Sequence, residues 1–184
     1  MPYHGVLTRE AFADAIQPEH VRISRFIQLA IVLGPLVFMV MVMAMALQRQ
    51  TAGTPGQDAG FLWPLTIVHL AYAVGAFLAG HLVSDRFFTA DRLAGDPTRE
   101  SAETLVLKCI GLRRTALIVR LALMESAAFF GLVVCLLAVF NGLLPDDTKY
   151  WINLASTVFL VVYGLVTLPT KERLAGWFEQ QFLR

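Results

Sequence analysis

Residues 115–140 read TALIVRLALMESAAFFGLVVCLLAVF, an apolar run that contains two charged residues, Arg120 and Glu125. Roughly 20 apolar residues in a helix cross a hydrocarbon core about 30 Å thick, so this run is long enough to span a bilayer. A helix of a soluble bundle would keep one polar face, whereas this run is apolar all round. The stretch therefore predicts a transmembrane helix that carries ionisable groups at two depths.

Three similar runs accompany it. They cover residues 26–48, 61–83 and 151–169, and none of them contains Asp, Glu, Lys or Arg. We predict an all-α, polytopic membrane protein in which residues 1–184 form a single domain of four transmembrane helices. Residues 1–25, 84–114 and 170–184 are then polar segments on one side of the membrane.

The composition supports this class and excludes others. Hydrophobic residues make up 57% of the chain and charged residues 16%, against about 25% charged in an ordinary soluble domain. High hydrophobicity excludes an intrinsically disordered chain, and a net charge of +1 excludes a polybasic nucleic-acid binder. With 2 cysteines a disulfide framework is also excluded. The expected surroundings are a lipid bilayer, with no nucleic acid.

The positions of Lys and Arg predict the orientation, because cytoplasmic segments are enriched in them. The three polar segments on one side carry twelve basic residues and the two opposite connections carry only Arg49 and Lys149. We therefore expect both termini to be cytoplasmic, in a multi-pass protein of the bacterial cytoplasmic membrane.

The cytoplasmic segments also contain helix signals. Asp96-Pro97 is a good helix start, and we predict one helix from about Pro97 through Phe140 whose first half extends into the cytoplasm. Thr8 to Gln17 predicts a short amphipathic helix capped by Thr8, with Phe12 and Ile16 on one face. This helix either anchors at the interface, docks a partner or rests on its own bundle.

Several residues predict how helices bend and end. Gly34-Pro35 predicts a bend in the first span. Asn141-Gly142 predicts a left-handed end of the third span, and Asp146-Asp147 suits the start of the fourth. A C-terminal amphipathic helix is expected after Pro169-Thr170, with Trp177, Phe178 and Phe182 along it.

Four ionisable side chains lie within the predicted spans and are the candidate functional residues: His69, His81, Arg120 and Glu125. Arg120 and His81 lie near the cytoplasmic ends of their spans, where they would fix the topology or an interface by reaching toward the surface.

Glu125 and His69 lie near the middle of their spans and are the candidate ion or proton site. Their depths differ by about five residues, or 7–8 Å, so their side chains could meet only if the two helices are neighbours. The alternative is a structural glutamate that is hydrogen-bonded to Ser, His or backbone in a tight helix interface.

The residues around Glu125, Leu121-Ala122-Leu123-Met124-Glu125-Ser126-Ala127-Ala128-Phe129-Phe130-Gly131, resemble the carboxylate helix of the proteolipid (c) subunits of rotary ATPases. That family carries a transported proton on an acidic residue among small residues. The resemblance covers residues 121–131 and implies a proton-carrying role for Glu125. The glycine-rich partner helix of that family has no counterpart here, so nothing else is carried over.

The sequence does not predict a copper, haem or enzymatic site within this chain. Met39, Met41, Met43 and Met45 fall on different helix faces and do not form one copper site. Haem needs axial ligands on facing helices, and His69 is the only mid-span histidine, which leaves only a site shared between subunits. We expect no catalytic residue, no metal ligand and no cofactor, and the common nucleotide, zinc and hydrolase motifs are absent.

Three functions are compatible with this pattern. The first is an accessory or scaffold subunit of a membrane assembly, with other membrane subunits or copies of itself as partners. The second is a proton- or cation-translocating subunit that uses Glu125. The third is a membrane enzyme or cofactor carrier that uses His69 and His81; we expect a non-enzymatic role, because catalysis needs several convergent polar groups.

Overall fold

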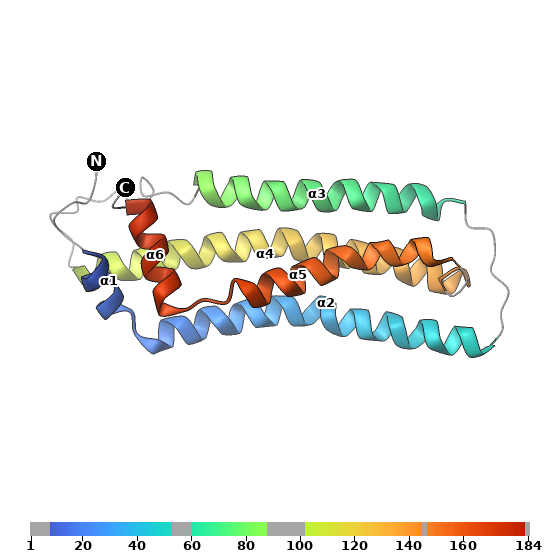
Figure 1. Ribbon diagram of the computed structural model, residues 1–184, viewed down its shortest axis with the longest axis horizontal. Coiled ribbons are helices and arrows are strands. Elements are labelled where there is room, and N and C mark those ends of the chain that lie inside the picture. Colours follow the sequence, from blue (N-terminus) through green and yellow to red (C-terminus); the bar gives the residue numbers. More distant parts are fainter. Residues whose placement is uncertain (1–7, 53–59, 88–101, 145–146, 183–184) are drawn as a thin grey trace.

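A computed structural model describes residues 8–52, 60–87, 102–144 and 147–182 of the protein, and the described chain is helical throughout its regular segments (Figure 1). Four segments are long and apolar enough to cross a membrane: Pro18–Gln48, Leu62–Val83, Glu103–Phe140 and Thr148–Val166. The elements are α1 (Arg9–Ala15), α2 (Pro18–Ala52), α3 (Leu62–Phe87), α4 (Ala102–Phe140), the 3-10 helix η2 (Thr148–Leu154), α5 (Ala155–Val166) and α6 (Lys171–Phe182).

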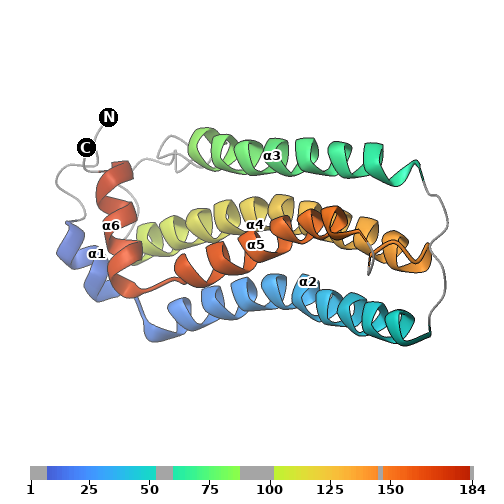
Figure 2. The ribbon, with the colours of Figure 1, turned by 45° about the vertical axis from the view of Figure 1, so that its right-hand side comes forward.

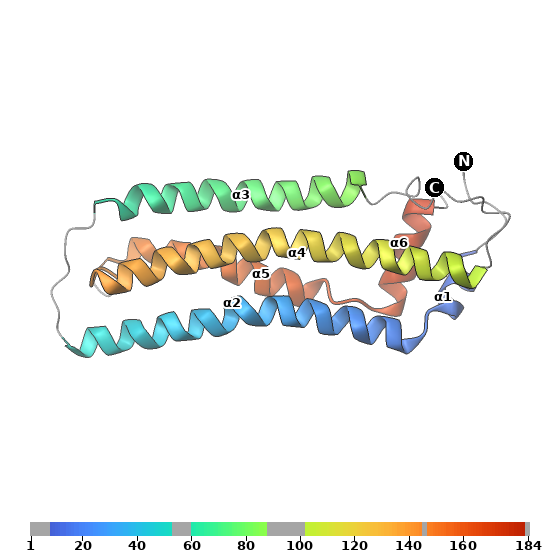
Figure 3. The same ribbon diagram turned by 180° about the vertical axis from the view of Figure 1, so that it is seen from behind.

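Helix α4 is the central element of the bundle. Figures 1 and 3 show α3 along one side of it and α2 along the other, with α5 crossing the space between. Half of the apolar part of α4 is buried, against 22% for α2 and for α3. The helix whose apolar part contains Arg120 and Glu125 is therefore the one around which the others pack, while α2 and α3 leave most of their apolar surface exposed.

The third span ends as its sequence predicts. Gly142 has a φ of 69°, a left-handed conformation that glycine adopts without strain. The amide of Leu143 then donates to the carbonyl of Ala138 at 2.9 Å and closes the end of the helix. The prediction of a left-handed end at Gly142 is confirmed.

The bend predicted at Gly34-Pro35 occurs within a continuous helix. Helix α2 runs through Pro35 without a break, and its two halves lie at an angle in Figure 2. Proline removes one backbone hydrogen bond and crowds the preceding turn, which accounts for the change of direction.

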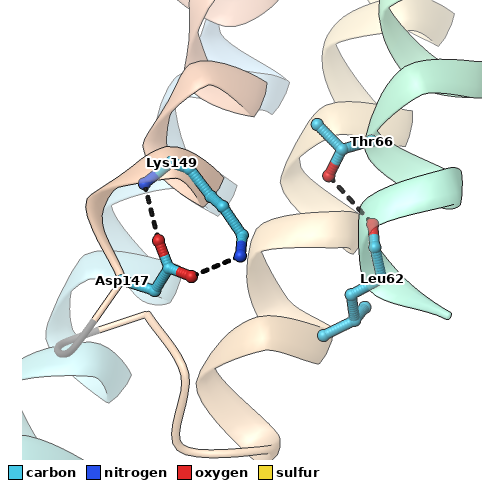
Figure 4. Close-up of polar contacts among 4 residues, drawn as sticks. All are labelled: Leu62, Thr66, Asp147 and Lys149. Atoms are coloured by element: carbon cyan, nitrogen blue, oxygen red, sulfur yellow. Dashed lines mark hydrogen bonds and ion pairs between the residues drawn. The ribbon is translucent and has the colours of Figure 1, made fainter. Parts of the chain in front are cut away.

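The fourth span begins as a 3-10 helix, which the sequence did not reveal. The carboxylate of Asp147 accepts from the Lys149 amide at 3.2 Å and pairs with the Lys149 ammonium at 2.5 Å (Figure 4). That ammonium also lies 5.8 Å from the Trp63 ring centre. Because the 3-10 helix is part of it, the fourth apolar segment covers Thr148–Val166. Each end lies three residues earlier than in the predicted span 151–169.

The two short helices α1 and α6 lie together at the end of the bundle where α4 begins (Figures 1 and 3). Thr8 caps α1 by accepting from the Ala11 amide at 3.1 Å, as predicted. Phe12 is buried and stacks on Phe178 of α6, with ring centres 4.2 Å apart. The short N-terminal helix therefore rests on its own bundle.

Helices α1 and α6 pack against the first half of α4. Val106 and Ile110 are buried in the same cluster as Phe12 and Phe178, so the helix extension is covered by α1 and α6. The described part of the extension begins at Ala102, and the predicted start at Pro97 lies outside the described residues.

Candidate functional site

A buried chain of polar side chains joins α3 to the fourth span. His69 and Asn153 are fully buried, and their Nδ1 and Oδ1 atoms lie 2.8 Å apart. The other ring nitrogen of His69, Nε2, lies 3.1 Å from the hydroxyl of Ser156. Both ring nitrogens therefore have protein partners.

The hydrogen bonds beyond Asn153 continue back to α3. Its amide nitrogen donates to the hydroxyl of Thr66 at 3.1 Å and to the carbonyl of Tyr150 at 3.0 Å. Thr66 in turn donates to the carbonyl of Leu62 at 3.0 Å (Figure 4). Asparagine can donate only from its nitrogen, so these bonds fix Oδ1 as the acceptor for His69.

This arrangement determines the proton positions on His69. Because Asn153 Oδ1 can only accept, Nδ1 of His69 must carry a hydrogen and donate it. In the neutral ring Nε2 is then an acceptor. The single hydrogen of the Ser156 hydroxyl is within reach of Nε2 at 3.1 Å, of the Asn153 carbonyl at 3.3 Å and of the Ala127 carbonyl at 3.4 Å. Each donor in the chain thus has an acceptor, as a buried polar group requires.

Gly131 allows the hydrogen-bonded residues His69 and Asn153 to approach the backbone of α4 closely. A Cβ built on Gly131 would lie 2.3 Å from the Asn153 carbonyl oxygen and 2.7 Å from the His69 ring. No side chain fits there, so α3, α4 and η2 meet at one glycine. The close approach buries the polar chain in protein and away from lipid.

Glu125 lies on a different side of α4, toward α2. Its Oε1 atom would be 3.5 Å from a Cβ built on Gly34, and the Phe129 ring would be equally close to that Cβ. The carboxylate is half-buried and has no hydrogen-bond or ion-pair partner among the described residues. It therefore lies beside Gly34-Pro35, at the point where α2 bends.

The structure does not join Glu125 to His69. Helices α3 and α4 are neighbours, but His69 contacts the α4 side of Gly131 and Ala127 whereas Glu125 faces α2. The nearby hydroxyl of Ser126 is bonded to Tyr72 at 2.9 Å. The predicted pair is thus two separate positions, one enclosed in hydrogen bonds and one without them.

Arg120 and His81 form a second polar contact, between α4 and α3. Nη2 of Arg120 contacts the His81 ring nitrogens, and the guanidinium carbon lies 4.9 Å from the Tyr163 ring centre on α5. Arg120 therefore connects three helices rather than reaching to the surface alone.

The polar residues that carry no charge were not predicted as site residues from the sequence. Gln28 is fully buried, and its amide donates to the Gly164 carbonyl at 2.6 Å and to the Thr167 hydroxyl at 3.0 Å, which joins α2 to α5. Asn153 was missed for the same reason. The available signal was a lone amide within an otherwise apolar run, because such groups are costly to bury without partners.

Comparisons with known proteins give no relative: no family model, curated protein or solved structure matches the chain. The functional argument consequently depends on the geometry alone. Within the described residues, no group of three or more His, Cys, Asp or Glu side chains is placed to hold a metal ion.

Proposed function

We propose that this protein is a small integral membrane protein that acts as an accessory or scaffold subunit of a membrane assembly. The observation that carries the proposal is the use made of the polar side chains in the spans. His69 with Asn153, Gln28 with Gly164 and Arg120 with His81 each connect two helices of the chain. Polar side chains that bond one helix to another stabilise a fixed helix arrangement, and few polar side chains then remain for a chemical reaction.

The outer surface supports a binding role within the membrane. A groove of about 390 Å³ lies between α3 and α5, and its lining includes the small residues Ala73, Ala127 and Ala155. Small residues allow another helix backbone to approach closely. The occupant we propose is an apolar transmembrane helix of another subunit, since the groove lies at the depth of the spans.

Photo-crosslinking tests this role. A photoreactive amino acid at Val74 or Phe159, which line the groove, should capture the same membrane subunit in native membranes, in stoichiometric yield. The matched control is Phe26 on α2, which is 74% exposed and lies away from the groove. Capture of lipid alone at all three positions, together with purification of the protein as a monomer, would contradict the proposal.

The orientation proposed with this function has both termini in the cytoplasm of a bacterial cell. The end that carries α1 and α6 holds Arg9, Arg22, Arg25, Lys171 and Arg173, whereas the opposite end holds Arg49 and Lys149. This asymmetry supports the cytoplasmic placement of α1 and α6.

Glu125 supports a second candidate function, translocation of a proton or cation. Its carboxylate has no partner among the described residues and adjoins the bend in α2. An ionisable residue that is unpaired at this depth is costly to retain for structure alone. The local resemblance to proteolipid subunits agrees with this role.

Two substitutions distinguish the candidates. If Glu125 carries the transported ion, Glu125→Gln abolishes flux in proteoliposomes and leaves the purified protein folded. If the protein is an accessory subunit, the Glu125→Gln variant still binds its partner subunit. If the carboxylate matters only for packing, Glu125→Gln changes little and Glu125→Leu impairs assembly. Unchanged flux in both variants would remove the translocation candidate.

We do not extend the proposal to an enzyme or cofactor carrier using His69 and His81. Both ring nitrogens of His69 already bond to Asn153 and Ser156, and His81 contacts Arg120. A metal or haem ligand at either position would first have to displace these bonds.

A further inference from the structure

A pocket of about 290 Å³ lies where α2, α4 and α6 meet beneath the end of α5. Three arginines line it: Arg113 and Arg114 from α4 and Arg173 from α6. No Asp or Glu is among the described residues that line the pocket. Like charges around one small space repel one another, and an anion bound between them would offset that repulsion.

Neighbouring groups hold these arginines in position. Arg173 donates from Nη1 to the Leu168 carbonyl at 3.2 Å and also contacts the Val166 carbonyl. Arg114 directs Nε toward the Ser24 hydroxyl at 3.5 Å. Each of these two guanidinium groups has five N–H donors, so donors on Arg114 and Arg173 remain for a ligand.

Arg113 is held differently, with its guanidinium carbon 5.5 Å from the Trp177 ring centre on α6. This contact places the positive charge of Arg113 at the wall of the pocket, while the donors that remain for a ligand are those of Arg114 and Arg173. The three side chains are therefore fixed from two helices.

The remaining walls place the pocket at the boundary of the apolar region. Leu117, Val166 and Leu174 line it together with the arginines, and the apolar fourth span ends at Val166. A ligand here would have its anionic group among the arginines and its apolar part beside the spans.

We infer that this pocket binds a phosphate group, with an anionic phospholipid headgroup as the favoured source. Planar guanidinium groups bond phosphate oxygens in pairs, and basic pockets at the cytoplasmic ends of transmembrane helices bind phospholipid headgroups. A free phosphate offers the same oxygens and is the other source. The inference depends on the membrane location and is independent of the accessory role.

The test measures phospholipid binding by the full-length protein. Wild type and Arg114→Gln/Arg173→Gln are placed in nanodiscs of phosphatidylcholine with increasing phosphatidylglycerol, and bound phosphatidylglycerol is counted by native mass spectrometry. We expect the double variant to bind about thirty-fold more weakly, because each basic residue at the surface contributes several-fold. Arg22→Gln/Lys171→Gln removes the same charge from the same end of the molecule outside this pocket and should bind as wild type does.

Further arms separate the sources and guard against misfolding. Inorganic phosphate titrated in phosphatidylcholine nanodiscs reports a free-phosphate site if it binds wild type and not the double variant, which supports the phosphate chemistry. Arg114→Lys/Arg173→Lys keeps the charge and should recover part of the binding if the first variant is folded. Equal binding by wild type and the Gln variant for both probes, or equal loss in the control pair, overturns the inference.

Discussion

Gly131 is the residue at which the packing is closest. An added Cβ would lie 2.3 Å from the backbone oxygen of Asn153, and a backbone atom cannot move aside as the end of a flexible side chain would. The sequence shows a glycine in an apolar helix and cannot show what faces it. Its importance becomes visible only when α3, α4 and η2 are placed together.

Replacing this glycine tests that packing. Gly131→Ala should destabilise the protein by about 1–3 kcal/mol, since an overpacked core must shift its backbone. Gly75→Ala is the control, because nothing lies within 4 Å of its added Cβ, and it should be neutral or stabilising by up to about 1 kcal/mol. Thermal unfolding in detergent measures both, and equal stability of the two variants would contradict the packing.

The hydrogen bonds of His69 make a separate prediction about its tautomer. The Asn153 contact requires a hydrogen on Nδ1. Nitrogen NMR of the labelled protein at neutral pH should therefore show Nδ1 protonated and Nε2 unprotonated. In Asn153→Leu this preference should disappear, with a loss of about 1–3 kcal/mol of stability from the unpaired ring. A ring protonated at Nε2 in wild type would refute this description.

Asp147 makes a prediction about pH outside the spans. The hydrogen bond from the Lys149 side chain lowers the pKa of this carboxyl from its ordinary value of 3.8. A lowered folded-state pKa means that the contribution to stability is present above pH 3.8 and is lost as the pH falls through the lower value. Carbon NMR should find a midpoint below 3.8 that rises in Lys149→Gln, and an unchanged midpoint in that variant would count against the contact.

At the scale of elements, α1 and α6 form a cap on the polar end of α4. Phe12 is buried between them, with an exposed fraction of 1%, and stacks on Phe178. The sequence predicted both helices, one from the Thr8 cap with Phe12 and Ile16 on one face and the other from the aromatic residues of the C-terminal segment. It could not predict that they stack on each other, because nothing local records which distant helix covers an apolar face.

Phe12→Ala tests this docking. Removing a buried aromatic ring costs about 3–5 kcal/mol, and here the loss should release α1 and α6 before the spans unfold. Hydrogen exchange should therefore accelerate in α1 and α6 while the middle of α4 stays protected. Phe26→Ala, at a position that is 74% exposed, should change neither, and faster exchange throughout Phe12→Ala would show that the cap is not a separate unit.

For the whole molecule, features that depend on neighbours in sequence were predictable, and features that depend on contacts between distant helices were not. Length and hydropathy predicted the four spans, and Gly142 and Thr8 predicted helix ends, because these properties depend on neighbours in sequence. Asn153 and Gln28 bond residues that lie 84 and 136 positions away along the chain, and the arginine pocket joins α4 to α6, so the roles of these groups emerged only from the fold. Glu125 was visible as a charged residue, but its position against Gly34 was not.

Every proposal above requires that the chain crosses the membrane four times. The most direct test places single cysteines at Glu10, Lys171 and Thr148, all exposed, in a background without Cys109 and Cys135, and labels intact cells with an impermeant maleimide. We predict that only the Thr148→Cys protein is labelled, and that Glu10→Cys and Lys171→Cys react only after the cells are opened. Labelling of Glu10 and Lys171 on opposite sides, or of Thr148 on their side, would contradict the four-span account.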